Sequence, residues 1–167
     1  NKKAHVQYEA LGVAGIISPW NYPLVTPTTT ISEALITGNN VILKPSEHTP
    51  LIMQYLKKLW DDNTNYKNAF QVIHGGADVG QMLIKSNNVD IICFTGSTAV
   101  GKKIAKQCSE TLKPIILELG GKDPMIVLKD ANQRRAVEAA IFGGLNNAGQ
   151  ACISIEQIFI EHQIFNE

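Results

Sequence analysis

Cys152 is the residue of this sequence whose setting best suits covalent chemistry. It ends the run Asn147-Ala-Gly-Gln-Ala-Cys152, in which small residues follow a helical pattern. Such a loop leaves a thiol accessible, and a thiolate is a strong nucleophile toward carbonyl carbon. Free cysteine is also a common small core residue, so the run alone leaves a buried and inert Cys152 equally open.

Two polar side chains upstream are suited to assist a nucleophile. Glu118 lies between two leucines in an apolar stretch. Burial there would raise the pKa of its carboxyl and suit it to accept a proton near neutral pH, whereas an ordinary edge position is the alternative. Asn21 follows a Pro-Trp pair in a turn, and its amide could donate to an oxyanion or simply to its own backbone.

Two further stretches have the residue types of a nucleotide site. Thr95-Gly96-Ser97 joins a predicted strand to a predicted helix, where Gly96 permits close backbone approach and the helix N-terminus attracts phosphate. Ser97 acting only as a helix cap is the alternative. Lys44 and Glu47 flank a proline turn at the end of another strand, where they could hold ribose hydroxyls or form a solvated pair.

Alternating strands and helices must position these residues. Apolar runs predict strands over residues 12–18, 40–44, 69–73, 89–94, 115–119, 125–128 and 155–161. Helical spacing predicts helices over about residues 24–37, 79–85, 98–111 and 130–145. A further helix is predicted to begin at Pro50, with Thr49 as its N-cap. This alternation favours an open parallel α/β sheet, and it loosens after Leu119, which suggests a domain boundary there.

Composition excludes several classes of partner. Among 167 residues, 15 basic and 15 acidic side chains give no net charge, and without a basic run we expect no nucleic-acid partner. No apolar run could span a bilayer and no signal peptide is visible, so we expect no membrane association. The spacing of the three cysteines fits neither a disulfide framework nor a metal site, so we expect a cytoplasmic protein without a metal. Two of the cysteines, Cys93 and Cys108, are expected in the core.

Five motifs together resemble the NAD(P)-dependent aldehyde dehydrogenase superfamily. In order and approximate spacing, they are Ser18-Pro-Trp-Asn-Tyr-Pro23, Leu43-Lys-Pro-Ser-Glu47, Phe94-Thr-Gly-Ser97, Leu117-Glu-Leu-Gly-Gly-Lys122 and Gly149-Gln-Ala-Cys152. The resemblance covers nearly the whole chain. It implies part of a Rossmann-like cofactor-binding domain over residues 1–119 and the start of a catalytic domain, with the nucleophile, over residues 120–167.

The resemblance also implies a role for each matching residue. Cys152 matches the nucleophile that forms a thiohemiacetal and then a thioester, Glu118 the general base, and Asn21 the oxyanion donor beside the Cys152 backbone N–H. Lys44 and Glu47 match the residues that hold the adenosine ribose, and Ser97 after Gly96 matches the serine at the pyrophosphate. Other matching positions line the cofactor cleft: Ile17, Trp20, Gly76, Gly80, Leu119 and Gly120.

The implied partners are a small-molecule aldehyde and a nicotinamide cofactor, in a full-length enzyme that forms a homo-oligomer. Glu47 favours NAD because a carboxylate beside the ribose repels a 2′-phosphate. The positive charge of Lys44 could offset that repulsion, so NADP is the alternative.

Two departures from the family pattern stand out. Gln157 occupies a position where the family usually has arginine, and the chain matches only the middle of a longer family member. Two hypotheses therefore remain open. The sequence is a piece of a working aldehyde dehydrogenase, or the 167-residue chain is an inactive fragment that at best binds nucleotide.

Overall fold

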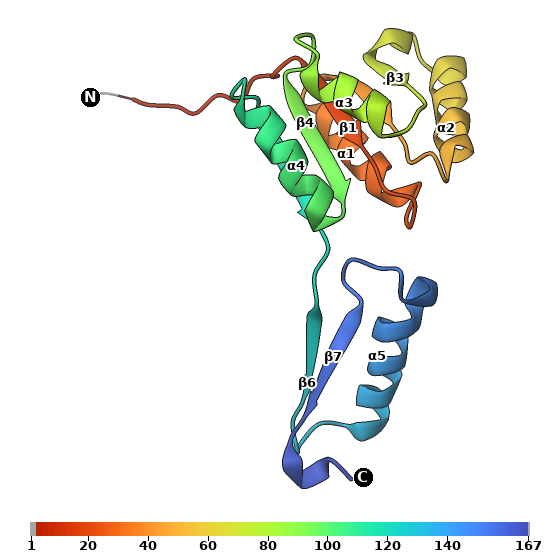
Figure 1. The fold of residues 1–167 in the computed structure, drawn as a ribbon, viewed down its shortest axis with the longest axis vertical. Helices are drawn as coiled ribbons and strands as arrows, with labels where there is room; N and C mark the ends of the chain where they lie inside the picture. Colours follow the sequence, from red (N-terminus) through yellow and green to blue (C-terminus); the bar gives the residue numbers. More distant parts are fainter. Residues whose placement is uncertain (1–2, 167) are drawn as a thin grey trace. The chain divides into compact units, whose positions relative to one another are not determined.

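The computed structural model describes residues 3–166 (Figure 1). Packing divides the chain into two units, Asn1–Glu118 and Leu119–Glu167. The division lies one residue before the boundary expected from the sequence. That the first unit is a cofactor-binding domain and the second the start of a catalytic domain stays a prediction.

The first unit is built on a parallel sheet with strand order β3-β2-β1-β4-β5. The strands are β1 (Val13–Ile17), β2 (Asn40–Lys44), β3 (Phe70–Val72), β4 (Ile91–Gly96) and β5 (Ile115–Leu119). The chain proceeds outward from β1 to β3 and then returns to add β4 and β5 on the other side of β1. The predicted open parallel sheet is thereby confirmed, and its strand order reverses between β1 and β4.

Helices cover both faces of this sheet, namely α1 (Val25–Ile36), α2 (Pro50–Asn63), α3 (Ala77–Lys85) and α4 (Thr98–Ser109). Right-handed crossovers made in opposite directions along a sheet place their helices on opposite faces. A core of α1, α2 and one sheet face is formed by Ile16, Ile31, Val41, Leu43, Met53, Phe70 and Cys93. Because side chains alternate along a strand, Ile17, Lys44 and Phe94 belong to the other face, toward α3 and α4 (Figure 1).

Thr49 occupies the predicted N-cap position of α2, but its side chain does not cap the helix. Pro50 does occupy the first turn, but the Thr49 side chain makes no capping hydrogen bond. Its backbone, at φ −138° and ψ 50°, departs from the extended conformation that points a capping oxygen at the first helical N–H groups. The Thr49 hydroxyl is instead buried without a hydrogen-bond partner among the residues that the structure describes.

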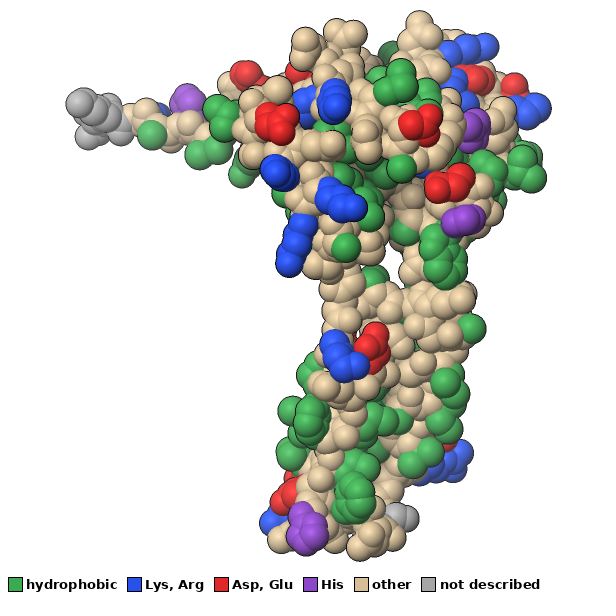
Figure 2. Space-filling model, in the orientation of Figure 1, with side chains coloured by type: hydrophobic (Ala, Val, Ile, Leu, Met, Phe, Trp, Pro, Cys, Tyr) green, Lys and Arg blue, Asp and Glu red, His purple; other side chains and the backbone are tan. Residues whose placement is uncertain are grey.

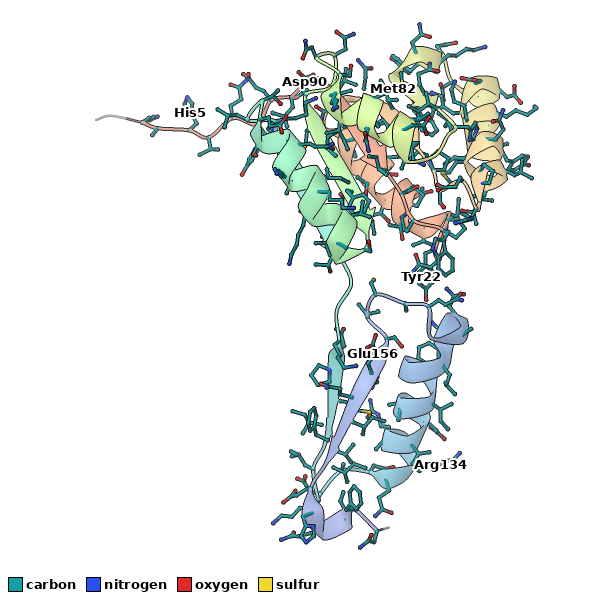
Figure 3. All side chains as sticks on the ribbon, viewed as in Figure 1. His5, Tyr22, Met82, Asp90, Arg134 and Glu156 are labelled. Atoms are coloured by element: carbon teal, nitrogen blue, oxygen red, sulfur yellow. The ribbon has the colours of Figure 1, made fainter. Side chains whose placement is uncertain are left out.

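The second unit is a single β-α-β element. Strands β6 (Asp123–Val127) and β7 (Ile155–Ile160) pair in parallel, and α5 (Gln133–Leu145) connects them. The Asn132 side chain caps α5 by accepting a hydrogen bond from the Arg135 N–H at 3.0 Å. Glu156 on β7, labelled in Figure 3, pairs with Lys122 just before β6 at 3.1 Å. Across residues 3–166, no helix combines the length and apolar character needed to cross a membrane.

Candidate functional site

A groove of about 240 Å³ lies between α3 and α4, beside the carboxyl ends of β1 and β2. It is lined by Ile17, Lys44, Ala77, Gly80, Gln81, Ile84, Phe94, Val100, Lys103, Ile104 and Gln107. The groove lies where the strand order reverses, which is where doubly wound sheets bind their ligands. Three residues expected at the cofactor, Ile17, Lys44 and Gly80, are among its lining.

Lys44 is the buried cation of this groove, with only 4% of its surface exposed. Its ammonium donates to the carbonyls of Gly75 at 2.8 Å and Pro45 at 2.9 Å, and pairs with the Glu47 carboxylate at 3.3 Å. All three N–H donors therefore have partners, as a buried charge requires. The alternative of a solvated pair is wrong for Lys44.

Glu47 lies at the open side of this pair, with 54% of its side chain exposed. A hydrogen bond from its own backbone N–H holds the pKa of the Glu47 carboxyl below its ordinary 4.5. Partial burial opposes that shift, while the nearby charges of Lys44 and His48 reinforce it. Glu47 is therefore a carboxylate at neutral pH.

Glycines keep the backbone around the groove close to its neighbours. A Cβ added to Gly80 would lie 3.7 Å from Cδ of Lys44 and 3.8 Å from Cδ1 of Ile17, so glycine leaves that space open. A Cβ added to Gly96 would come within 2.5 Å of the Phe94 ring, a separation that real atoms do not tolerate. In the turn from β4 into α4, position 96 therefore has no room for a side chain beside the Phe94 ring.

The remaining residues expected at the cofactor have varied settings. Ser97 caps α4, with Oγ accepting a long hydrogen bond from the Val100 N–H at 3.4 Å, so its capping role is real. Gly76 is the residue before α3, and Trp20 is 45% exposed in the segment after β1. Leu119 and Gly120 belong to the second unit and are not among the groove lining.

Cys152 is exposed, whereas Cys93 and Cys108 are buried. The alternative of a buried, inert Cys152 is therefore wrong, and the expected core positions of the other two are confirmed. Burial raises the pKa of both the Cys93 and the Cys108 thiol, which keeps them protonated and unreactive. Cys152 is the accessible thiol of the described chain.

The loop before Cys152 has a conformation that sequence reasoning missed. Asn147, Ala148 and Gly149 are consecutive residues with positive φ, at 52°, 58° and 74°. Asparagine and glycine tolerate the left-handed region, so Asn147 and Gly149 could have indicated the turn from the sequence. Alanine disfavours this region, so Ala148 gave no such indication. The small residues therefore serve a sharp turn as well as access to the thiol.

Cys152 itself lies within a second turn. The Ser154 N–H donates to the Ala151 carbonyl at 3.1 Å, which makes Cys152 the second residue of a four-residue turn. The end of the Leu117–Lys122 motif lies beside it, since a Cβ on Gly121 would be 3.6 Å from the Cys152 carbonyl oxygen. Two motifs far apart in sequence thus meet inside the second unit.

Glu118 corrects one argument from the sequence. It lies on β5 and is exposed among the described residues, so the expected burial is wrong and the alternative of an ordinary edge position holds. Ile116, two residues earlier on the same face of this edge strand, is also 50% exposed. Asn21 is half-buried in the turn after β1. Asn21 and Glu118 belong to the first unit and Cys152 to the second, so their joint action stays a prediction.

The reversing parallel sheet and its groove define a doubly wound α/β protein of the Rossmann-like class. The chain belongs to the aldehyde dehydrogenase family, whose sequence model matches residues 1–167.

Relatives and solved structures agree with this assignment. The chain is 38% identical to the D-glyceraldehyde dehydrogenase (NADP(+)) of Picrophilus torridus, over 100% of the chain and 34% of that protein. It is 41% identical to the betaine aldehyde dehydrogenase of Bacillus subtilis, over 95% of the chain and 33% of that protein. Among solved structures, the chain is similar to an NAD+ complex of a Bacillus cereus aldehyde dehydrogenase, with a TM-score of 0.92 and 37% sequence identity. The match covers 94% of this chain and 32% of the Bacillus cereus chain. The chain thus spans about a third of the length of these relatives.

Proposed function

We propose that this chain is part of an enzyme that oxidises a small-molecule aldehyde to a carboxylic acid, with NAD as hydride acceptor and NADP as the alternative. Family membership supports the reaction, and the named NAD+ complex and NADP(+) relative support the choice of cofactors. The observation that carries the proposal is that one chain contains both an exposed Cys152 and, in its other unit, a switch-point groove lined by Ile17, Lys44 and Gly80.

The groove fits one end of a dinucleotide. Its volume of about 240 Å³ is below the roughly 300 Å³ at which pockets for whole ligands begin, so it suits a base and its ribose. Lys44 and Glu47 would hold ribose hydroxyls, and Ser97 with the first N–H groups of α4 would meet the pyrophosphate. When bound, the nicotinamide accepts the hydride that leaves the aldehyde carbon.

The chain's own residues supply the remaining chemistry. The Cys152 thiolate attacks the aldehyde carbon and forms a C–S bond, while the carbonyl electron pair moves onto oxygen. The Asn21 amide and the Cys152 backbone N–H donate to that oxygen, and one such donor is typically worth about 3 kcal/mol. When the C=O bond re-forms and hydride leaves, a thioester remains on Cys152.

Glu118 then completes the cycle as general base. It accepts a proton from water, and the resulting hydroxide attacks the thioester carbon. The C–S bond breaks, the thiolate of Cys152 is regenerated and the carboxylic acid departs. The exposed position of Glu118 leaves its carboxylate accessible to water.

A second candidate function follows from the length of the chain. The chain spans about a third of the length of its relatives, and this candidate is that the 167-residue chain by itself would bind nucleotide without turnover. Homo-oligomer formation belongs, on this proposal, to the full-length enzyme. Gln157 on β7, at the position of the usual arginine, would alter a contact near the nucleophile segment.

Calorimetric titration with NAD, together with an assay for NADH formation from propanal, tests both candidates. We expect NAD to bind the wild type and Cys152→Ala equally, with turnover lost only in Cys152→Ala. Cys108→Ala, which removes a buried thiol, is the matched control and should keep turnover. Binding without turnover by the wild type selects the second candidate, and absence of NAD binding contradicts both.

A further inference from the structure

Ser154 is a buried polar residue two positions after Cys152, with 5% of its surface exposed. Its Oγ lies 3.3 Å from the carbonyl oxygens of both Gly143 and Gly144. A hydroxyl has one proton to donate, so the two carbonyls share it. Both belong to the last turn of α5, where backbone carbonyls have no partner within the helix. The hydroxyl thus ties the chain just after Cys152 to the end of α5.

The chain before Cys152 approaches the same two glycines. A Cβ added to Gly149 would lie 3.2 Å from the Gly144 carbonyl oxygen. On the other side, a Cβ added to Gly143 would overlap the Ile155 side chain, so Ile155 packs directly on that backbone. The segment from Gly149 to Ile155 is therefore held against the Gly143-Gly144 pair at both of its ends.

A tie of this kind is needed because the loop conformation is strained. Asn147 and Ala148 are non-glycine residues in the left-handed region, at φ 52° and 58°. Each such residue costs on the order of 1 kcal/mol and persists only where surrounding contacts hold it. The closure of the Cys152 turn by the Ser154 N–H adds a second contact from the same residue.

We propose that Ser154 is a positioning residue for the Cys152 thiol, acting through its hydroxyl on the Gly143-Gly144 end of α5. The catalytic consequence rests on the proposed function of Cys152, whereas the tie itself does not. Attack on a carbonyl depends on alignment, and displacement of a reacting group by about 1 Å can cost roughly 100-fold in rate. Removing the hydroxyl removes its hydrogen bonds to both carbonyls and so loosens the hold of the Cys152 turn on the end of α5.

Three variants isolate this hydroxyl. Ser154→Ala removes it, and Ser154→Thr keeps it. Ser109→Ala is the matched control, because the Ser109 hydroxyl also donates to a helix-end carbonyl, that of Lys106 at 2.7 Å, in the other unit. Amide hydrogen exchange of Ser154 should become about tenfold faster in Ser154→Ala, and stay near the wild-type rate in Ser154→Thr and Ser109→Ala. Unchanged exchange in Ser154→Ala, or no rescue by threonine, overturns the proposal.

Steady-state kinetics then separate positioning from general damage. In Ser154→Ala, kcat for aldehyde oxidation should fall about tenfold while the Kd for NAD stays unchanged, and Ser154→Thr should restore kcat. An unchanged kcat, or equal losses in kcat and NAD binding, overturns the positioning role. If the wild type binds NAD but lacks aldehyde oxidation, the second candidate function is selected, and the exchange comparison still decides the tie.

If Ser154→Ala does not fold, amide hydrogen exchange of the wild-type protein tests the Ser154 tie instead. A Ser154 amide protected as strongly as the amides of α5 supports the tie. A Ser154 amide that exchanges as fast as an unstructured peptide overturns it, because an untied turn opens freely.

Discussion

Lys44 and Glu47 show how one residue pair can serve both the fold and a ligand. The Lys44 ammonium is buried and needs its three partners, of which the Glu47 contact, at 3.3 Å, is the longest. A ribose hydroxyl entering the groove would therefore compete most easily with Glu47. The carbonyls of Pro45 and Gly75 would continue to hold the cation in place.

Glu47→Gln should change cofactor preference. Removing the carboxylate removes the repulsion of a 2′-phosphate, so the NADP-to-NAD affinity ratio should rise about tenfold, an effect of roughly 1.4 kcal/mol. Titration with each cofactor measures this ratio. Glu110→Gln, at the far end of α4, removes the same charge and should leave the ratio unchanged. A ratio that stays the same in Glu47→Gln would contradict a role for this carboxylate.

The pH dependence of that preference has a definite sign. The pKa of Glu47 is lowered in the folded chain, so the folded state holds fewer protons at this group than the unfolded state does. The preference for NAD and the stabilising effect of the carboxylate are both present at neutral pH. Both should be lost only as the pH falls through the lowered pKa, so titrations at pH 8 and pH 6 should give the same ratio.

Gly80→Ala should separate stability from binding. The added methyl meets Lys44 and Ile17 at ordinary contact distances, and alanine favours a helix over glycine by about 0.8–1 kcal/mol, so the free energy of unfolding should rise. The same methyl occupies the floor of the groove, so NAD affinity should fall. Denaturant unfolding and calorimetry measure the two effects. Unimpaired NAD binding would place the cofactor elsewhere.

At the scale of elements, the loop between α5 and β7 combines strain with anchoring. Its left-handed residues turn the chain back toward the end of α5, where Gly143 and Gly144 permit close contact. A Cβ on Gly143 would overlap the Ile155 side chain, whereas a Cβ on Gly144 would meet the Ile155 carbonyl oxygen at an ordinary 3.5 Å. Gly143 is therefore the glycine that the packing of Ile155 against α5 requires.

Gly149→Ala and Ala148→Gly should have opposite effects on stability. Gly149 has φ 74° and an added Cβ would lie 3.2 Å from the Gly144 carbonyl, so Gly149→Ala should destabilise the fold by about 1–2 kcal/mol. Ala148→Gly relieves strain at φ 58° and should be neutral or stabilising by up to about 1 kcal/mol. Denaturant unfolding of both variants measures this, and equal destabilisation would argue against a left-handed loop.

At the scale of the whole molecule, the second unit leaves many apolar side chains uncovered. Val137, Ile141, Phe142 and Leu145 on α5 and Ile126 on β6 are each more than half exposed. Hydrophobic side chains are visible along this unit in Figure 2. Two strands and one helix bury too little apolar surface to be stable without further contacts.

The 167-residue chain should therefore self-associate. Sedimentation velocity should give a sedimentation coefficient that rises with protein concentration, because association covers apolar surface. Phe142→Gln, which removes a side chain that is 70% exposed, should weaken the association. A monodisperse monomer over the same concentrations would count against this expectation.

Local patterns determined much of this protein. Apolar periodicity and turn residues located the strands and α-helices of the described chain to within a few residues but missed its three short 3-10 helices, and strand-helix alternation predicted the parallel sheet. These features depend on residues close together in sequence. The five motifs likewise carried the family resemblance, because each is a short run that can be read without the fold.

Only the tertiary structure decided how the site residues are surrounded. Lys44 is buried because Gly75, 31 residues away, returns to meet it, and Ser154 is satisfied by carbonyls 10 and 11 residues back. Glu118 is exposed on an edge strand, and its apolar neighbours in sequence could not decide between that position and burial. Burial and hydrogen-bond partners depend on which distant segments come into contact, and a local sequence pattern does not specify those contacts.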